Sequence, residues 1–213
     1  MSFRPAARQF FERRAAPPPP LPYDAEVEYL ESTGTQWIQL GFGFDPSDEI
    51  EASFSIDTSE KNDKYMNAAQ TWNSGRTFGM GVAGGGKLTM AFGNASSTST
   101  VLVPVTINDG AFHTWKYDNR VCSVTDLSVS YDMTGLSFTT TTNLLRLFFG
   151  YNTPTKGKIA YYKHRKNGVL MCDLYSVRFT NELGQREGAM YDRVSGALFR
   201  NAGTGAFLWA EKQ

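Results

Sequence analysis

The stretch DEIEASFSID, residues 48–57, alternates apolar and polar side chains without a break. Ile50, Ala52, Phe54 and Ile56 share one side of an extended chain, and acidic or small polar residues occupy the other side. A helix would scatter these apolar residues around its axis. The period of two therefore predicts an antiparallel strand with one buried and one solvated face.

Similar short runs recur along the chain and are separated by turn-forming residues. Beyond 48–57 they lie at residues 26–32, 35–40, 76–83, 87–93, 100–107, 111–118, 126–133, 143–151, 157–164 and 169–179. Asn167-Gly168 is a dipeptide typical of tight hairpins. No interior segment shows a convincing helical period, and 213 residues suffice for one large domain. These features predict an all-β fold, a two-sheet antiparallel jelly-roll sandwich.

Residues 1–22 have a different composition from the rest of the chain. They hold four arginines against Glu12, and prolines at 17–20 and 22 predict a stiff extended segment. Subtracting these residues from 21 basic and 21 acidic side chains leaves 17 against 20, so the basic charge is concentrated at the front. We therefore expect an N-terminal arm over 1–22 and a sandwich domain over 23–213.

The charge balance excludes some partners. The formal net charge is zero, which argues against general binding to nucleic acid or to an acidic membrane. No apolar run is long enough for a membrane span or a secretory signal, so we expect synthesis in a reducing cytoplasm. Cys122 and Cys172 lie in strand-like runs and are interpreted as small buried hydrophobic residues, with a disulfide as the alternative.

GVAGGGKL, residues 81–88, resembles a phosphate-binding loop in its first seven positions. Leu88 stands where a hydroxyl would bind magnesium, and the residues that follow predict a strand rather than a helix. A glycine-rich hairpin turn is the better interpretation.

Catalytic and metal chemistry has few candidates. His113 and His164 are isolated in the sequence, so no zinc spacing exists, and His113 is interpreted as a structural histidine. Loops at 44–49 and 59–63 could bind calcium through carboxylates, but no cofactor is expected. Hydrolysis of sugars needs paired carboxylates. Glu49 and Glu51 share a strand face, but the run lacks the final glutamate of the jelly-roll glucanases, so we expect no enzyme.

Binding of sugars without chemistry is the alternative that the residues support more easily. Exposed aromatic rings flanked by amide and charged donors are typical of such sites. The stretch YMNAAQTWNSGRTF offers candidate glycan-binding residues, namely Tyr65, Trp72, Asn73 and Arg76. The competing interpretation is that Trp72 only seals an edge of the sandwich.

Two further stretches carry a family resemblance. EYLESTGTQWIQLG at 28–41 and GAMYDRVSGALFRNAGTGAF at 188–207 resemble the opening and closing motifs of concanavalin A-like, laminin-G-like domains found in structural proteins of bacteriophages and prophages of gut bacteria. Residues 108–118 and 157–179 resemble inner parts of the same pattern, so the likeness spans 26–210. We expect Trp37 to enter the core, and Phe207 and Trp209 to close the sheet.

The resemblance implies a non-enzymatic virion component, located in the phage particle as a capsid decoration, head fibre or tail-associated protein. Its partners would be other capsid or tail proteins and further copies of itself, with host-surface or mucin glycans as ligands of the alternative function. The N-terminal arm would anchor the domain by charge-assisted contacts and aromatic side chains. The anchoring candidates are Arg4, Arg8, Phe10, Phe11, Arg13 and Arg14.

Overall fold

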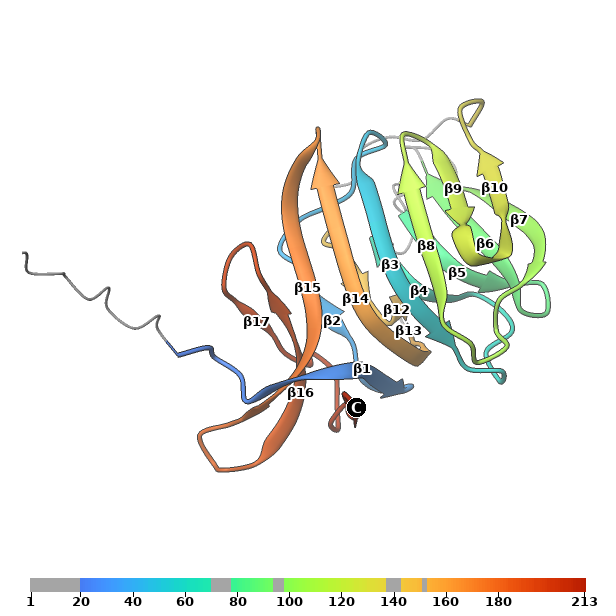
Figure 1. The fold of residues 1–213 in the computed structure, drawn as a ribbon. Coiled ribbons are helices and arrows are strands. Elements are labelled where there is room, and N and C mark those ends of the chain that lie inside the picture. The colour runs from blue at the N-terminus through green and yellow to red at the C-terminus, as the bar shows by residue number, and fades with distance from the viewer. Residues whose placement is uncertain (1–19, 70–77, 94–97, 137–142, 151–152) are drawn as a thin grey trace, which may run out of the picture.

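Two antiparallel sheets packed face to face form the protein, as the alternating runs predicted (Figure 1). The computed structural model describes residues 20–69, 78–93, 98–136, 143–150 and 153–213. Within these ranges the regular structure is all strand, apart from one short 3₁₀ turn, η1 (Thr125–Leu127). The prediction of an all-β antiparallel sandwich is confirmed.

The larger sheet has ten strands and is termed sheet A. Its order is β10-β9-β8-β3-β14-β1-β15-β16-β17, with β18 paired to β1. The strands are β1 (Ala25–Thr33), β3 (Glu49–Ile56), β8 (His113–Asp118), β9 (Val121–Val124), β10 (Val129–Asp132), β14 (Lys156–Lys166), β15 (Val169–Thr180), β16 (Arg186–Asp192), β17 (Leu198–Phe199) and β18 (Leu208–Glu211).

The smaller sheet has six strands and is termed sheet B. Its order is β2-β11-β4-β5-β6-β7. The strands are β2 (Ile38–Gln39), β4 (Lys64–Ala69), β5 (Phe78–Ala83), β6 (Lys87–Gly93), β7 (Thr98–Thr106) and β11 (Arg146–Leu147). A two-stranded ribbon of β12 (Phe149–Gly150) and β13 (Thr153–Pro154) adjoins it.

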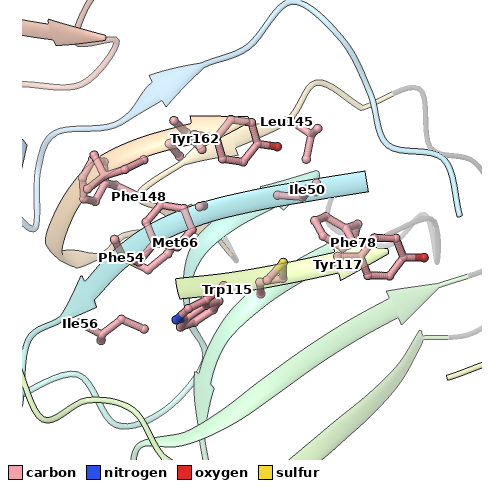
Figure 2. Packing of buried hydrophobic residues seen from close by; sticks show 14 of the residues in the cluster. Ile50, Phe54, Ile56, Met66, Phe78, Trp115, Tyr117, Leu145, Phe148 and Tyr162 are labelled. Carbon is pink, nitrogen blue, oxygen red and sulfur yellow. The ribbon is translucent and has the colours of Figure 1, made fainter. Parts of the chain in front are cut away.

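One hydrophobic core fills the space between the sheets. Ile50, Ala52, Phe54 and Ile56 are each at most 2 % exposed, so the alternation in β3 places all four inward as predicted. Trp115 packs edge-on to Phe54, and Figure 2 shows both among the buried side chains of the core. Burial of these side chains is the main stabilising contribution to the sandwich.

The predicted turns have the backbone that their residues favour. Asn167 and Gly168 both have positive φ, 50° and 74°, as a tight hairpin of this type requires. Gly84, Gly85 and Gly86 also have positive φ and join β5 to β6, so GVAGGGKL forms a hairpin turn.

Two predicted strands differ in the structure. Residues 126–133 begin in η1, and the strand β10 starts only at Val129, after Ser128 adopts a left-handed conformation. The run 143–151 is divided into β11 and β12 because Phe148 has a φ of 60°. A single left-handed residue ends the local pairing in each case, and neither Ser nor Phe signals that conformation in a sequence.

The stretches 28–41 and 188–207 lie against each other. The Thr35 hydroxyl donates to the Thr204 carbonyl at 2.9 Å, and the Trp37 amide donates to the Asn201 side chain at 3.1 Å. Phe207 is 1 % exposed and Trp209 packs against the core, while β18 pairs with β1, which places both residues as expected.

Candidate functional site

A polar pocket of about 300 Å³ lies on the outer face of sheet A, at one end of strands β1, β3 and β14. The residues that line it are Glu31, Ser32, Thr33, Ser55, Asp57, Gly110, Lys156, Gly157 and Lys158. Cross-strand register explains this set. Glu31 pairs with Lys158, and Lys158 pairs with Ser55, so three neighbouring strands bring polar side chains together. The volume is at the small end of the range of ligand pockets.

The loop before β8 forms one wall of the pocket. The Ser55 hydroxyl donates to the Gly110 carbonyl at 2.8 Å, and the Gly110 amide donates to the Ile56 carbonyl at 3.2 Å. The loop is thereby attached to β3 on the side of the pocket.

His113 fixes the base of the same loop. One ring nitrogen lies 3.1 Å from an oxygen of Asp109, and the other lies 2.6 Å from an oxygen of Asp126. The ring is 3 % exposed, so a structural role is consistent with its position. These two contacts, termed the His113 clamp, hold the loop against β8 and η1.

Two aromatic rings stand beside the pocket. The Tyr29 and Phe112 ring centroids are 5.6 Å apart at an interplanar angle of 44°, and Phe112 is 37 % exposed. The ammonium of Lys158 lies 4.7 Å from the Tyr29 centroid and 4.0 Å from an oxygen of Glu31. Lys158 thus contacts both the Tyr29–Phe112 pair and the carboxylate of Glu31 in the pocket lining.

The chemistry of the lining is balanced between donors and acceptors. Lys156 and Lys158 supply ammonium donors, and Glu31 and Asp57 supply carboxylate acceptors. Asp57 accepts hydrogen bonds from the amide and hydroxyl of Ser59, which lower its pKa against the opposing effect of burial. It is therefore an acceptor at neutral pH. A ligand with several hydroxyl groups, each both donor and acceptor, matches such a lining.

A row of tyrosines crosses the outer face of sheet A beyond the pocket. Tyr161 on β14, Tyr175 on β15 and Tyr191 on β16 are in register on adjacent strands. The Lys163 ammonium lies 5.6 Å from the Tyr161 centroid, and the Arg193 guanidinium carbon lies 3.6 Å from the Tyr175 centroid. Each cation also has a carboxylate nearby, so the row is internally paired.

Glu51, the carboxylate considered for hydrolysis, lies at the end of this row. Its oxygens lie 3.0 Å from the Lys116 ammonium and 3.2 Å from the Tyr161 hydroxyl. The Lys116 contact lowers the pKa of Glu51, which opposes a role as a proton donor. Phe54 is buried in the core where the glucanase pattern requires a second carboxylate.

Of the four predicted glycan-binding residues, the structure describes only Tyr65. The Tyr65 ring is fully buried on the outer side of sheet B and lies against Gly79 and Gly150. It has no exposed face for stacking on a sugar. Trp72, Asn73 and Arg76 lie outside the described residues, as do the six anchoring candidates of the arm.

The two cysteines are free and buried, which agrees with their interpretation as small core residues. Burial raises the pKa of Cys122 to about 12, and burial also raises the pKa of Cys172 above its usual range. Both thiols are therefore protonated at neutral pH and lack the thiolate that reactive cysteines need.

His164 belongs to a polar group in the interior that the sequence did not reveal. One ring nitrogen lies 2.8 Å from a carboxylate oxygen of Asp48, and the other lies 3.1 Å from the Tyr162 hydroxyl. His164 and Asp48 are both fully buried. The contact attaches the turn before β3 to β14. The only hint of this buried pair in the sequence was the acidic residue Asp48 directly before the alternating run of β3.

The loops considered for calcium use their carboxylates in other contacts. In 44–49, Asp45 accepts from Ser47 and Asp48 pairs with His164. In 59–63, Glu60 accepts from the Lys156 amide at 2.9 Å. Among the described residues, no three His, Cys, Asp or Glu side chains are grouped for metal binding.

Neither a family model nor a curated protein matches this chain. Within the described part of the chain, no helix is long and apolar enough to cross a membrane.

Proposed function

We propose that the protein is a non-enzymatic carbohydrate-binding domain whose ligand occupies the pocket on sheet A. The observation that carries the proposal is the combination of a donor-acceptor lining with the Tyr29–Phe112 pair at its side. Sugars need both, because their hydroxyl groups form hydrogen bonds while the apolar C–H face of the ring packs on aromatic surface. The two lysines and two acids of the lining balance, which favours a neutral sugar.

The test is a glycan array followed by calorimetry with the best neutral ligand. We expect Phe112→Ala to weaken binding about three- to tenfold, because the lost aromatic contact contributes about 0.5–1.5 kcal/mol. Glu31→Gln, which removes a charged acceptor, is also expected to weaken binding.

Tyr131→Ala is the matched control, because Tyr131 has the same 37 % exposure as Phe112 but lies on β10, at the edge of the sheet. Absence of any glycan ligand, or equal loss in Phe112→Ala and Tyr131→Ala, would overturn the proposal.

We further propose that this domain is displayed on a phage particle, as the resemblance of 28–41 and 188–207 implies. The observation that favours this setting is that the two stretches form one packed unit through Thr35, Thr204, Trp37 and Asn201. Leu21, at the start of the described chain, is 57 % exposed.

Co-sedimentation with particles that lack the protein tests the anchoring role of the arm. The full chain is expected to co-sediment at low salt and less at high salt, since screening weakens arginine contacts. A variant with Arg4, Arg8, Arg13 and Arg14 changed to glutamine should remain in the supernatant. Equal sedimentation of both proteins would contradict anchoring by the arm.

A further inference from the structure

Arg146 is a single cation in the apolar run NLLRLFFG. It lies on β11, where it pairs with Gln39 on one side and Ala68 on the other, while its neighbour Leu147 is buried in the core. Because neighbouring strand residues point to opposite faces, Arg146 lies on the outer side of sheet B. This is the sheet opposite the polar pocket.

The left-handed conformation of Phe148 brings a second side chain to the same side. In a regular strand Phe148 would point outward with Arg146, yet it is fully buried and packs on Phe207. Its φ of 60° interrupts the alternation, so that Phe149 lies beside Arg146. Figure 2 shows Phe148 among the core side chains.

Trp37 completes a cluster of three side chains. The Trp37 and Phe149 ring centroids are 5.0 Å apart, and the guanidinium carbon of Arg146 lies 5.2 Å from the first and 4.9 Å from the second. Trp37 is held from behind by the closing stretch, because its amide donates to Asn201 and its carbonyl accepts from Ala202. Contrary to the expectation that Trp37 enters the core, it is only partly buried and joins the core to this cluster.

The guanidinium has no anionic partner in the described structure. No ion pair joins Arg146 to any described carboxylate, and its buried Nε has no hydrogen-bond partner among the described residues. The segments outside the description contain one acidic residue in total, Glu12 of the arm. The Arg146 guanidinium therefore forms no ion pair with a carboxylate of the described domain.

An unpaired, partly desolvated charge is costly, and aromatic contacts offset only part of that cost. Burial lowers the pKa of Arg146 from its very high usual value, yet an arginine stays charged under all ordinary conditions. Its planar fork of N–H donors matches a carboxylate in a bidentate arrangement. The adjoining rings offer flat apolar surface to whatever bears that carboxylate.

We propose that Arg146, Trp37 and Phe149 form a binding site for a carboxylate-bearing ring compound, such as an acidic sugar. The carboxylate pairs with the guanidinium, and the body of the ligand packs on the two rings. The site lies on sheet B and shares no residue with the pocket on sheet A, so it does not depend on the proposed function. The protein then has two separate ligand sites on opposite faces of the sandwich.

The test is a titration of the full-length protein with glucuronate, with glucose as the neutral counterpart and sulfate as an anion without a ring. The readouts are the NMR signals of the Arg146 Nε–H and the Trp37 indole N–H. We expect saturable shifts with glucuronate alone. Arg146→Gln should weaken binding at least about tenfold, since a hydrogen-bonded charge pair contributes about 1.5–3 kcal/mol. Arg146→Lys, which keeps the charge and loses the fork, should weaken it less.

Arg200→Gln is the matched control, because Arg200 also lies over an aromatic ring, 4.5 Å from the Phe179 centroid, but is exposed and directly follows β17 of sheet A. It should leave glucuronate binding unchanged. Equal binding of glucose and glucuronate, equal binding of sulfate, or no loss in a folded Arg146→Gln variant would overturn the proposal. Binding that appears only in Glu12→Gln would show that the arm occupies the site and would also overturn it.

Discussion

At the scale of single residues, glycines decide how closely the outer side of sheet B can pack. A Cβ built on Gly79 would lie 2.6 Å from the Tyr65 ring, and one built on Gly150 would lie 2.5 Å from the same ring. The ring of Tyr65 therefore occupies the space that two side chains would fill. This packing accounts for an aromatic residue that is fully buried although it faces away from the main core.

Gly81→Ala should be strongly destabilising, because the new Cβ would lie 1.9 Å from the Lys64 carbonyl oxygen, which belongs to a paired strand and cannot move freely. We expect a loss of roughly 2–4 kcal/mol in the free energy of unfolding, measured by urea denaturation. Gly41→Ala should change it by less than about 0.5 kcal/mol, because no atom lies within 4 Å of that position. Similar values for the two variants would contradict the packing argument.

The His113 clamp predicts acid sensitivity. Burial alone would raise the pKa values of Asp109 and Asp126, but their hydrogen bonds, including those from His113, outweigh it, and both pKa values are lowered. The folded pKa values thus lie below the unfolded value of about 3.9. The stabilisation is complete above that value and is lost as the pH falls through the folded values.

Urea denaturation at pH 7 and at about pH 3 measures this effect. Asp126→Asn should reduce the difference in unfolding free energy between the two pH values. Asp118→Asn should leave the difference nearly unchanged, because Asp118 is an exposed carboxylate on β8, the strand of His113, and does not contact the His113 ring. An unchanged pH dependence in Asp126→Asn would argue against the clamp.

At the scale of elements, the sequence predicted strands and turns well where local patterns determine them. The alternation in β3 and the Asn167-Gly168 turn depend on neighbouring residues, and both were found where expected. The division of 143–151 was not predictable, because the φ of Phe148 is imposed by its burial against Phe207 from the far end of the chain. The same reason explains why the aromatic–arginine cluster was missed, although one cation in an apolar run was a usable signal.

The candidate pocket was also beyond prediction from the sequence. Glu31, Ser55 and Lys158 come from three separate runs, and only the register of β1, β3 and β14 brings them together. For Tyr65 the sequence was misleading. Polar residues near it in the sequence favoured an exposed ring, but the ring packs against Gly79 and Gly150 and is fully buried.

The β5–β6 turn allows backbone strain to be separated from steric overlap. Gly85 and Gly86 have similar positive φ values, 89° and 95°, but a Cβ on Gly85 has no neighbour within 4 Å, whereas one on Gly86 would lie 2.0 Å from the Asn108 side chain. Gly85→Ala should cost about 1 kcal/mol from strain alone. Gly86→Ala should cost clearly more, as judged by thermal unfolding, since Asn108 also holds the Thr58 and Glu60 carbonyls. An equal cost would mean that Asn108 moves aside freely.

At the scale of the whole molecule, the first strand lies inside sheet A instead of at its edge. β1 pairs with β14, β15 and β18, and all three come from the last third of the chain (Figure 1). Most contacts that complete the large sheet are therefore distant in sequence, which is typical of slowly folding β proteins.

A chain that ends before Val169 should fail to reach the native state, because β1 would lack two of its three partner strands. We expect near-UV circular dichroism of such a fragment to lack the tertiary signal of the full chain, and its unfolding to lack a cooperative transition. A cooperative transition in the fragment would show that the remaining strands suffice without β15 and β18.

The central place of β1 has a consequence for synthesis on the ribosome. β1 is synthesised before all of its partner strands. More than a hundred further residues must be translated before β14, the first of these partners, exists. During that interval Val27 and Leu30, which are buried in the finished sheet, are available to other nascent chains or to chaperones. Only a chain translated through β18 can enclose β1 on all its paired sides, so the folding of this sheet depends on the synthesis of its last strand.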